Sequence, residues 1–151
     1  MPKMFNTPEL YVSFPHQWPP FRAHSLLHIA SGGADINWVD MPGIEDDCAA
    51  ATYGLDVDAE HLVVGLNQKV KDGSAKMGFS QSTGYIGLLD VVGDSGMELI
   101  PAGIDDIHSV RSDGTDIFIV SSEINSVVRI EKSDLGRRTP EIIYRAHPAD
   151  V

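Results

Sequence analysis

The sequence has a single cysteine, Cys48, and no long hydrophobic run. One cysteine cannot form an internal disulfide, so nothing in the chain requires an oxidising compartment. No apolar stretch approaches the roughly 20 residues of a membrane-spanning helix. The opening, MPKMFNTPELYVSF, has no basic segment followed by an apolar core of the secretory kind. We therefore expect a soluble, cytoplasmic protein that does not enter a membrane.

Basic residues are also scarce. The chain carries 11 Lys and Arg against 22 Asp and Glu, which gives a formal net charge of −11. Nucleic acids and anionic membrane surfaces both require a basic binding surface, so neither is expected as a partner. The acidic balance fits an acidic solvated surface, or a site that attracts cations.

Helical periodicity is nearly absent. No segment places apolar residues at i, i+3, i+4 and i+7 over three turns, whereas short apolar runs alternate with polar turns along the whole chain. Short strands with regularly spaced turn signals are typical of all-β proteins, and we predict that class.

A unit of four short strands recurs along the chain. Its central strand reads LYVSF at 10–14, LVVGL at 62–66 and IFIVS at 117–121. The copies lie about 50 residues apart, a spacing found in β-propeller blades. We predict one domain over 1–151 with blades at about 9–47, 48–106 and 107–151. The blades would be antiparallel sheets, the first with three strands and the other two with four, about eleven strands in all. An immunoglobulin-like sandwich is the alternative, but it would not explain the repeat.

Three blades are fewer than the 4–8 that close a propeller. An open stack leaves apolar sheet faces and edges uncovered. The prediction is therefore a partial propeller. It would be part of a larger propeller, or it would self-associate so that two halves of three blades form a six-bladed ring.

The segment IHSVRSDGTDIFIVSSEINSVVRI, at 107–130, places an Asp-Gly turn between two strands and an Asn before a third. This pattern resembles the blades of six-bladed propellers of the NHL and gluconolactonase (senescence-marker) type. The resemblance extends from Asp46 to Ile130. It implies a site at the mouth of a central channel, where carboxylate and Asn side chains bind Ca²⁺ in the gluconolactonase-like members.

In a propeller, the loops between fourth and first strands and those between second and third strands emerge on one face. His108 opens a first strand and should lie near the channel mouth. Asp106, Glu123 and Asn125 are the candidate metal ligands, because Ca²⁺ takes 6–8 oxygen ligands. The competing interpretation is that these Asp residues hydrogen-bond backbone amides in turns. The residues predicted on this face are Asp46, Asp47, Asn67, Asp105, Asp106, His108, Glu123 and Asn125.

Four further segments have predicted roles. Asp58-Ala59 and Asp113-Gly114 are predicted to be structural turns on the opposite face. The segment 70–83 is predicted to be a long loop that acts as a lid or partner contact, or is simply a surface loop. The segment 14–21, FPHQWPPF, is the corresponding stiff loop of the first blade.

Two functions follow from this pattern. The first is a binding or interaction module that uses the loop face, because propellers support many unrelated functions. The second is a metal-dependent hydrolase of the lactonase type, in which a carboxylate acts as general base. A third alternative is an incomplete gene product without a function of its own.

Overall fold

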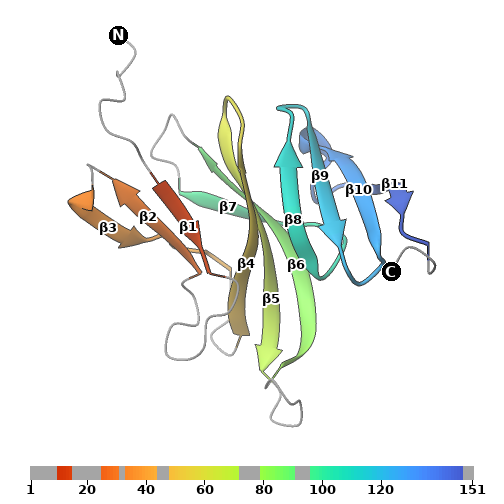
Figure 1. The fold of residues 1–151 in the computed structure, drawn as a ribbon, viewed down its shortest axis with the longest axis horizontal. Coiled ribbons are helices and arrows are strands. Elements are labelled where there is room, and N and C mark those ends of the chain that lie inside the picture. The colour runs from red at the N-terminus through yellow and green to blue at the C-terminus, as the bar shows by residue number, and fades with distance from the viewer. Residues whose placement is uncertain are drawn as a thin grey trace.

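A computed structural model of the chain describes residues 10–14, 25–30, 33–43, 48–71, 79–90 and 96–147, with only the backbone described at 48–50, 69–71 and 79–82. Within these residues the protein is all-β, as predicted, and its strands form three antiparallel sheets. The sheets follow one another along the chain (Figure 1).

The first sheet has three strands, in the order β1 (Leu10–Ser13), β2 (Leu26–Ala30) and β3 (Asp35–Trp38). The last of these strands, β3, ends at Trp38. The backbone then continues alongside β2 only through Val39, whose N–H donates to the Leu26 carbonyl at 2.9 Å.

The middle sheet has the order β4 (Cys48–Val57), β5 (His61–Lys71), β6 (Phe79–Asp90) and β7 (Met97–Pro101). The predicted loop over 70–83 is wrong in its extent, since strand pairing continues to Lys71 opposite Phe79. β5 and β6 both extend into this segment, because the backbone N–H and carbonyl groups of each strand form hydrogen bonds with the other strand. Residues 72–78 of that segment, and 15–21 of the predicted first loop, lie outside the described residues.

The third sheet has the order β8 (Ile107–Ser112), β9 (Asp116–Ser121), β10 (Ser126–Glu131) and β11 (Glu141–Arg145). A 3₁₀ turn, η2 (Lys132–Asp134), follows β10. The four strands predicted for this segment are all present. The hairpins β4–β5 and β8–β9 lie at one end of the molecule, and the C-terminal end of β5 and the N-terminal end of β6 lie at the other (Figure 1).

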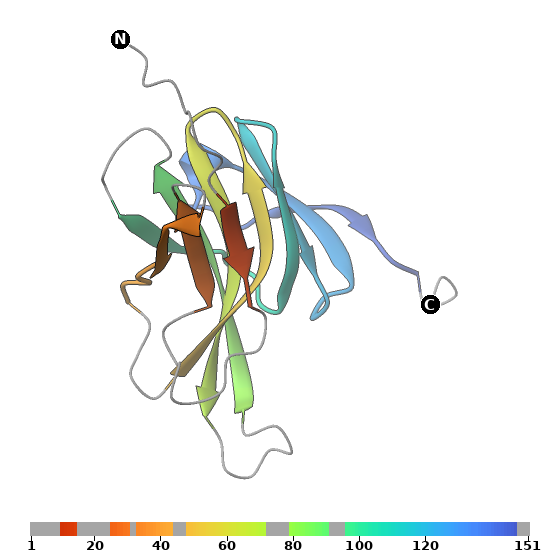
Figure 2. The same ribbon diagram turned by 60° about the vertical axis from the view of Figure 1, so that its left-hand side comes forward.

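The middle sheet is covered on both faces. On one face, Leu62, Val64 and Leu66 pack with Leu26 of the first sheet and with Met41, which follows that sheet in the sequence. On the other face Val63 and Ile86 pack with apolar residues of the third sheet, which are Ile107, Val110, Ile117, Ile119, Val128 and Ile130. The alternation of apolar residues along β5 thus forms two cores, because successive side chains of a strand point to opposite faces. Figure 2 shows the first sheet standing against the middle one.

The first strands of the middle and third sheets approach each other closely. A Cβ added to Gly54 of β4 would lie 2.6 Å from the Val110 backbone nitrogen of β8. Only glycine allows two backbones to come this near. The candidate site described below lies at this junction between β4 and β8.

Candidate functional site

Tyr53 and His108 occupy matching β-bulges in β4 and β8. On β4, Thr52 pairs with Leu66 and Gly54 with Gly65, so Tyr53 is an extra residue. On β8, Ile107 and Ser109 pair with the adjacent Ser121 and Val120, so His108 is the extra residue there. Bulges re-aim side chains and are common beside active sites.

The two bulged side chains meet between the sheets. The rings of Tyr53 and His108 have centroids 5.1 Å apart and are tilted by 38°. This distance lies within the range of favourable ring pairs. The His108 side chain remains about half exposed, at 47%. Tyr53 and His108 therefore contribute to the molecular surface at the junction of the middle and third sheets.

Asp106 adds a carboxylate to this pair. Its Oδ1 lies 3.5 Å from His108 Nε2, and its Oδ2 accepts a hydrogen bond from the Ser122 hydroxyl. The Ser122 backbone N–H also donates to the Asp106 carbonyl, at 3.1 Å. Asp106 has a positive φ of 49°, which Asp tolerates better than most residues. The imidazole, phenol ring and carboxylate together can bind a polar or cationic group.

Glu123 and Asn125 lie in the turn between β9 and β10, next to Asp106. Both are exposed, and Asn125 has a positive φ of 47°. The Asn125 N–H donates to the Ser122 carbonyl at 3.3 Å, and its own carbonyl accepts from Ala146 N–H at 2.9 Å. The turn is thus tied to Asp106 on one side and to the end of β11 on the other.

Asp105 and Asn67 have structural partners. Asp105 Oδ1 accepts from Gly84 N–H at 2.9 Å, and its carbonyl accepts from the Ser121 hydroxyl at 2.7 Å. Asn67 lies within β5, not in a loop, and is fully buried. Its amide donates to the Ile107 carbonyl and accepts from Ile107 N–H, both at 2.9 Å. These two residues join the segments that carry the site.

Ca²⁺ binding by Asp106, Glu123 and Asn125 stays a prediction. Within the described residues, no three His, Cys, Asp or Glu side chains are placed to hold one ion. The Asp106 carboxylate already has Ser122 and His108 as partners. Asp46 and Asp47 lie outside the described residues.

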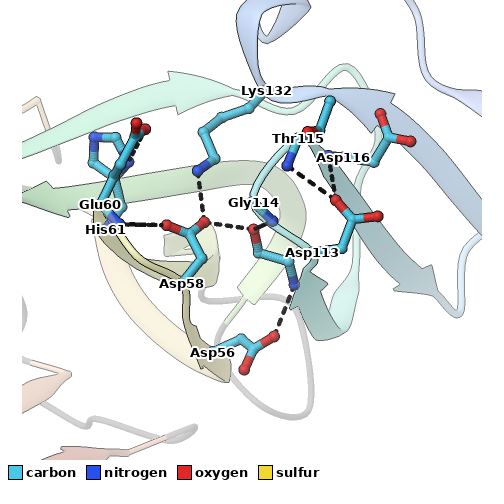
Figure 3. Close-up of polar contacts among 10 residues, drawn as sticks. Asp56, Asp58, Glu60, His61, Asp113, Gly114, Thr115, Asp116 and Lys132 are labelled. Carbon is cyan, nitrogen blue, oxygen red and sulfur yellow. Dashed lines mark hydrogen bonds and ion pairs between the residues drawn. The ribbon is translucent and has the colours of Figure 1, made fainter.

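A second polar cluster lies at the opposite end, around Asp58 (Figure 3). Asp58 Oδ2 pairs with Lys132 Nζ at 2.5 Å and accepts from the Ser112 hydroxyl at 2.6 Å. Its Oδ1 accepts from the backbone N–H groups of Glu60 and His61. Burial alone raises the pKa of Asp58, but the hydrogen bonds from Lys132, Ser112 and the two amides hold that pKa well below its usual range.

The Asp113 turn has the same hydrogen bonds as the Asp58 turn. In each, Oδ1 accepts from the amides two and three residues on, and the Asp N–H donates to the carbonyl three residues on. The amides of Asp116 and Thr115 lower the pKa of Asp113. The structural role predicted for both turns is confirmed.

Tyr53, Asp56 and Lys132 were not singled out from the sequence. A signal for Tyr53 was present, because it stands five residues before Asp58 just as His108 stands five before Asp113. Asp56 accepts from Ser112 N–H at 2.7 Å. No local pattern indicates this contact or the one between Lys132 and Asp58, because both join residues distant in sequence.

Within the part of the chain that the structure describes, no helix has the length and apolar character to cross a membrane. Comparison with protein-family models, curated proteins and solved structures found no match.

Proposed function

We propose that the chain is a binding module of the β-propeller type whose ligand surface is the end of the molecule that carries Tyr53, Asp106 and His108. The observation that carries this proposal is the pair of matching bulges in β4 and β8. A bulge interrupts strand pairing, and here two of them turn aromatic side chains toward each other at a solvent-accessible junction.

Several features support the propeller architecture. The sheets are consecutive antiparallel meanders, the middle sheet packs on both neighbours, and the first strands β4 and β8 lie side by side. Propellers likewise arrange four-stranded sheets radially, with their first strands nearest the axis.

The charge of the site favours a cationic ligand. Asp106 lies beside His108, and the exposed Glu123 follows Ser122, to which Asp106 is hydrogen-bonded. The chain as a whole carries a net charge of −11, which raises the local concentration of cations. A small molecule or peptide segment with an ammonium or guanidinium group would pair with the carboxylates and place apolar surface on the rings.

The test is an NMR titration of the full chain with a fragment set balanced among cationic, neutral and anionic members. We expect cationic fragments to shift the signals of Tyr53 and His108. Asp106→Asn should weaken their binding about tenfold, through loss of one charge-assisted hydrogen bond. Asp35→Asn, an exposed aspartate of β3, is the control and should bind as the parent does. Equal binding of all three fragment classes would contradict the proposal.

Calcium separates this proposal from the metal-dependent hydrolase. Calorimetric titration with Ca²⁺ should give the same result for the parent chain and for the Asp106→Ala, Glu123→Ala double variant. A saturable signal abolished by that variant would favour the hydrolase instead.

A further inference from the structure

The first sheet has an apolar face turned away from the middle sheet. Residues paired directly across antiparallel strands share a face, and the register places one apolar set on the side away from the middle sheet. Phe14 extends this set, because its ring lies 5.5 Å from that of Trp38. Ile36 is 58% exposed and Leu10 56%. The set, called here the leading face, is Leu10, Val12, Phe14, Leu27, Ile29, Ile36 and Trp38.

The third sheet has a second such face, also turned away from the middle sheet. Val120 pairs with Val127, and Val127 pairs with Tyr144, so these three share the face turned away from the middle sheet. Phe118 lies on the same side of β9, and Val120 and Tyr144 are exposed. Phe118, Val120, Val127 and Tyr144 are called here the trailing face. Beside them Arg129 is neutralised by Asp116 and Glu141, which lie 3.7 and 3.1 Å away.

The two contacts inside the molecule show what these faces fit. In the aligned strands β1, β5 and β9, Leu10 matches Leu62 and Ile117, and Tyr11 matches Val63 and Phe118. Leu62 packs toward the first sheet and Ile117 toward the middle sheet, so this position meets the preceding sheet.

The alternate position meets the following sheet, because Tyr11 packs toward the middle sheet and Val63 toward the third. By this rule, the leading face carries the positions that elsewhere contact a preceding sheet. The trailing face carries those that contact a following sheet.

We infer that the trailing face of one chain packs on the leading face of a second copy of this chain. The contact would repeat the stacking that the protein already uses between its own sheets. It joins two different surfaces, so it must either close a ring or continue as a filament. Two copies bring together six sheets, within the 4–8 blades of closed propellers, whereas three copies would exceed that number. The expected assembly is a dimer closed by two equivalent contacts.

The experiment is light scattering of the full chain over a range of concentrations. The expected mass is twice the 16.4 kDa of the chain. Ile36→Lys on the leading face and Val120→Lys on the trailing face should each weaken the dimer about thirtyfold or more, as expected for a buried hot-spot residue. Val57→Lys is the matched control, because Val57 is 61% exposed but belongs to the middle sheet. It should leave the dimer intact.

Mixing the two variants tests the head-to-tail geometry. Ile36→Lys keeps its trailing face and Val120→Lys keeps its leading face, so an equimolar mixture should form dimers through one intact contact. That result would also show that both variants are folded. A monomeric parent chain, an effect of only one of the two substitutions, or a mixture that stays monomeric would each overturn the proposal. The ligand site at Tyr53 and His108 is tested separately and does not depend on this outcome.

Discussion

Asn67 is a polar side chain inside an apolar interface, and its hydrogen bonds to the backbone of Ile107 explain why a polar residue is found there. β8 is the edge strand of the third sheet, so its outward backbone groups have no neighbouring strand. The Asn67 amide bonds both the N–H and the carbonyl of the fully buried Ile107. A side-chain amide thus replaces the peptide group that another strand would supply.

Replacing Asn67 with Ala should lower the free energy of unfolding by about 2–4 kcal/mol, because two buried backbone groups lose their partners. Urea denaturation followed by circular dichroism measures this change. The control is Asn37→Ala, at an exposed position of β3, which should change stability by less than about 0.5 kcal/mol. Equal effects of the two substitutions would show that the Asn67 bonds add little stability.

Asp58 and Lys132 form an ion pair that is largely withdrawn from solvent, with side chains 5% and 11% exposed. Removing one partner of such a pair leaves the other charge buried and costs about 3–5 kcal/mol. Asp58→Asn should therefore be strongly destabilising at neutral pH. The double variant Asp58→Asn, Lys132→Met should lose less than the sum of the single variants, as unfolding measurements on all three would show.

Asp58 should also make stability depend on pH. Its pKa in the folded protein lies below the ordinary aspartate value of 3.8, so its stabilising effect is present above that value. The effect is lost as the pH falls through 3.8 toward the lower folded pKa. The parent protein should lose stability over this acidic range more steeply than Asp58→Asn. Parallel curves for the two proteins, from denaturation at a series of pH values, would contradict this assignment.

The β4–β8 junction depends on a residue without a side chain. A methyl group at Gly54 would lie 2.6 Å from Val110 N and 3.1 Å from the Ser109 Cα, which are backbone atoms that cannot turn away. Gly54→Ala should cost about 1–3 kcal/mol by forcing the strands apart. It should also broaden the NMR signals of Tyr53 and His108, which lie beside the junction. Gly96→Ala is the control, since no atom lies within 4 Å of its added Cβ. A similar fall in melting temperature for both variants would argue against strand separation.

The strands themselves were predictable because each is a short apolar run bounded by turn residues. The Asp turns after β4 and β8 were predictable from the same local signals, and both turns form the same hydrogen bonds. The length of the β5–β6 hairpin was not predictable in the same way. Polar residues in 67–71 and 79–83 resemble a loop when read alone, but strand pairing satisfies their backbone groups.

Across the whole molecule, the middle sheet should be the most stable part. Its strands β5 and β6 contribute to both apolar clusters, whereas β11 is exposed along its length. In the monomeric Ile36→Lys variant, amide hydrogen exchange should be slowest in β5 and β6 and much faster in β11, because local opening is hardest where both faces are covered. Exchange followed by NMR measures this difference. Protection of β11 equal to that of β5 would mean that the sheets open only as one unit.

The all-β class and the two Asp turns follow from the sequence alone, because they depend on local alternation and turn chemistry. Only the tertiary structure brings Tyr53 to His108, Asn67 to Ile107 and Lys132 to Asp58. The Asn67–Ile107 and Lys132–Asp58 pairs are 40 and 74 positions apart in the sequence, and each links the middle sheet to the third sheet or to the turn that follows β10. Such contacts depend on how the sheets stack, which is decided by the shape and burial of whole faces. The local sequence around a single residue therefore does not predict these contacts.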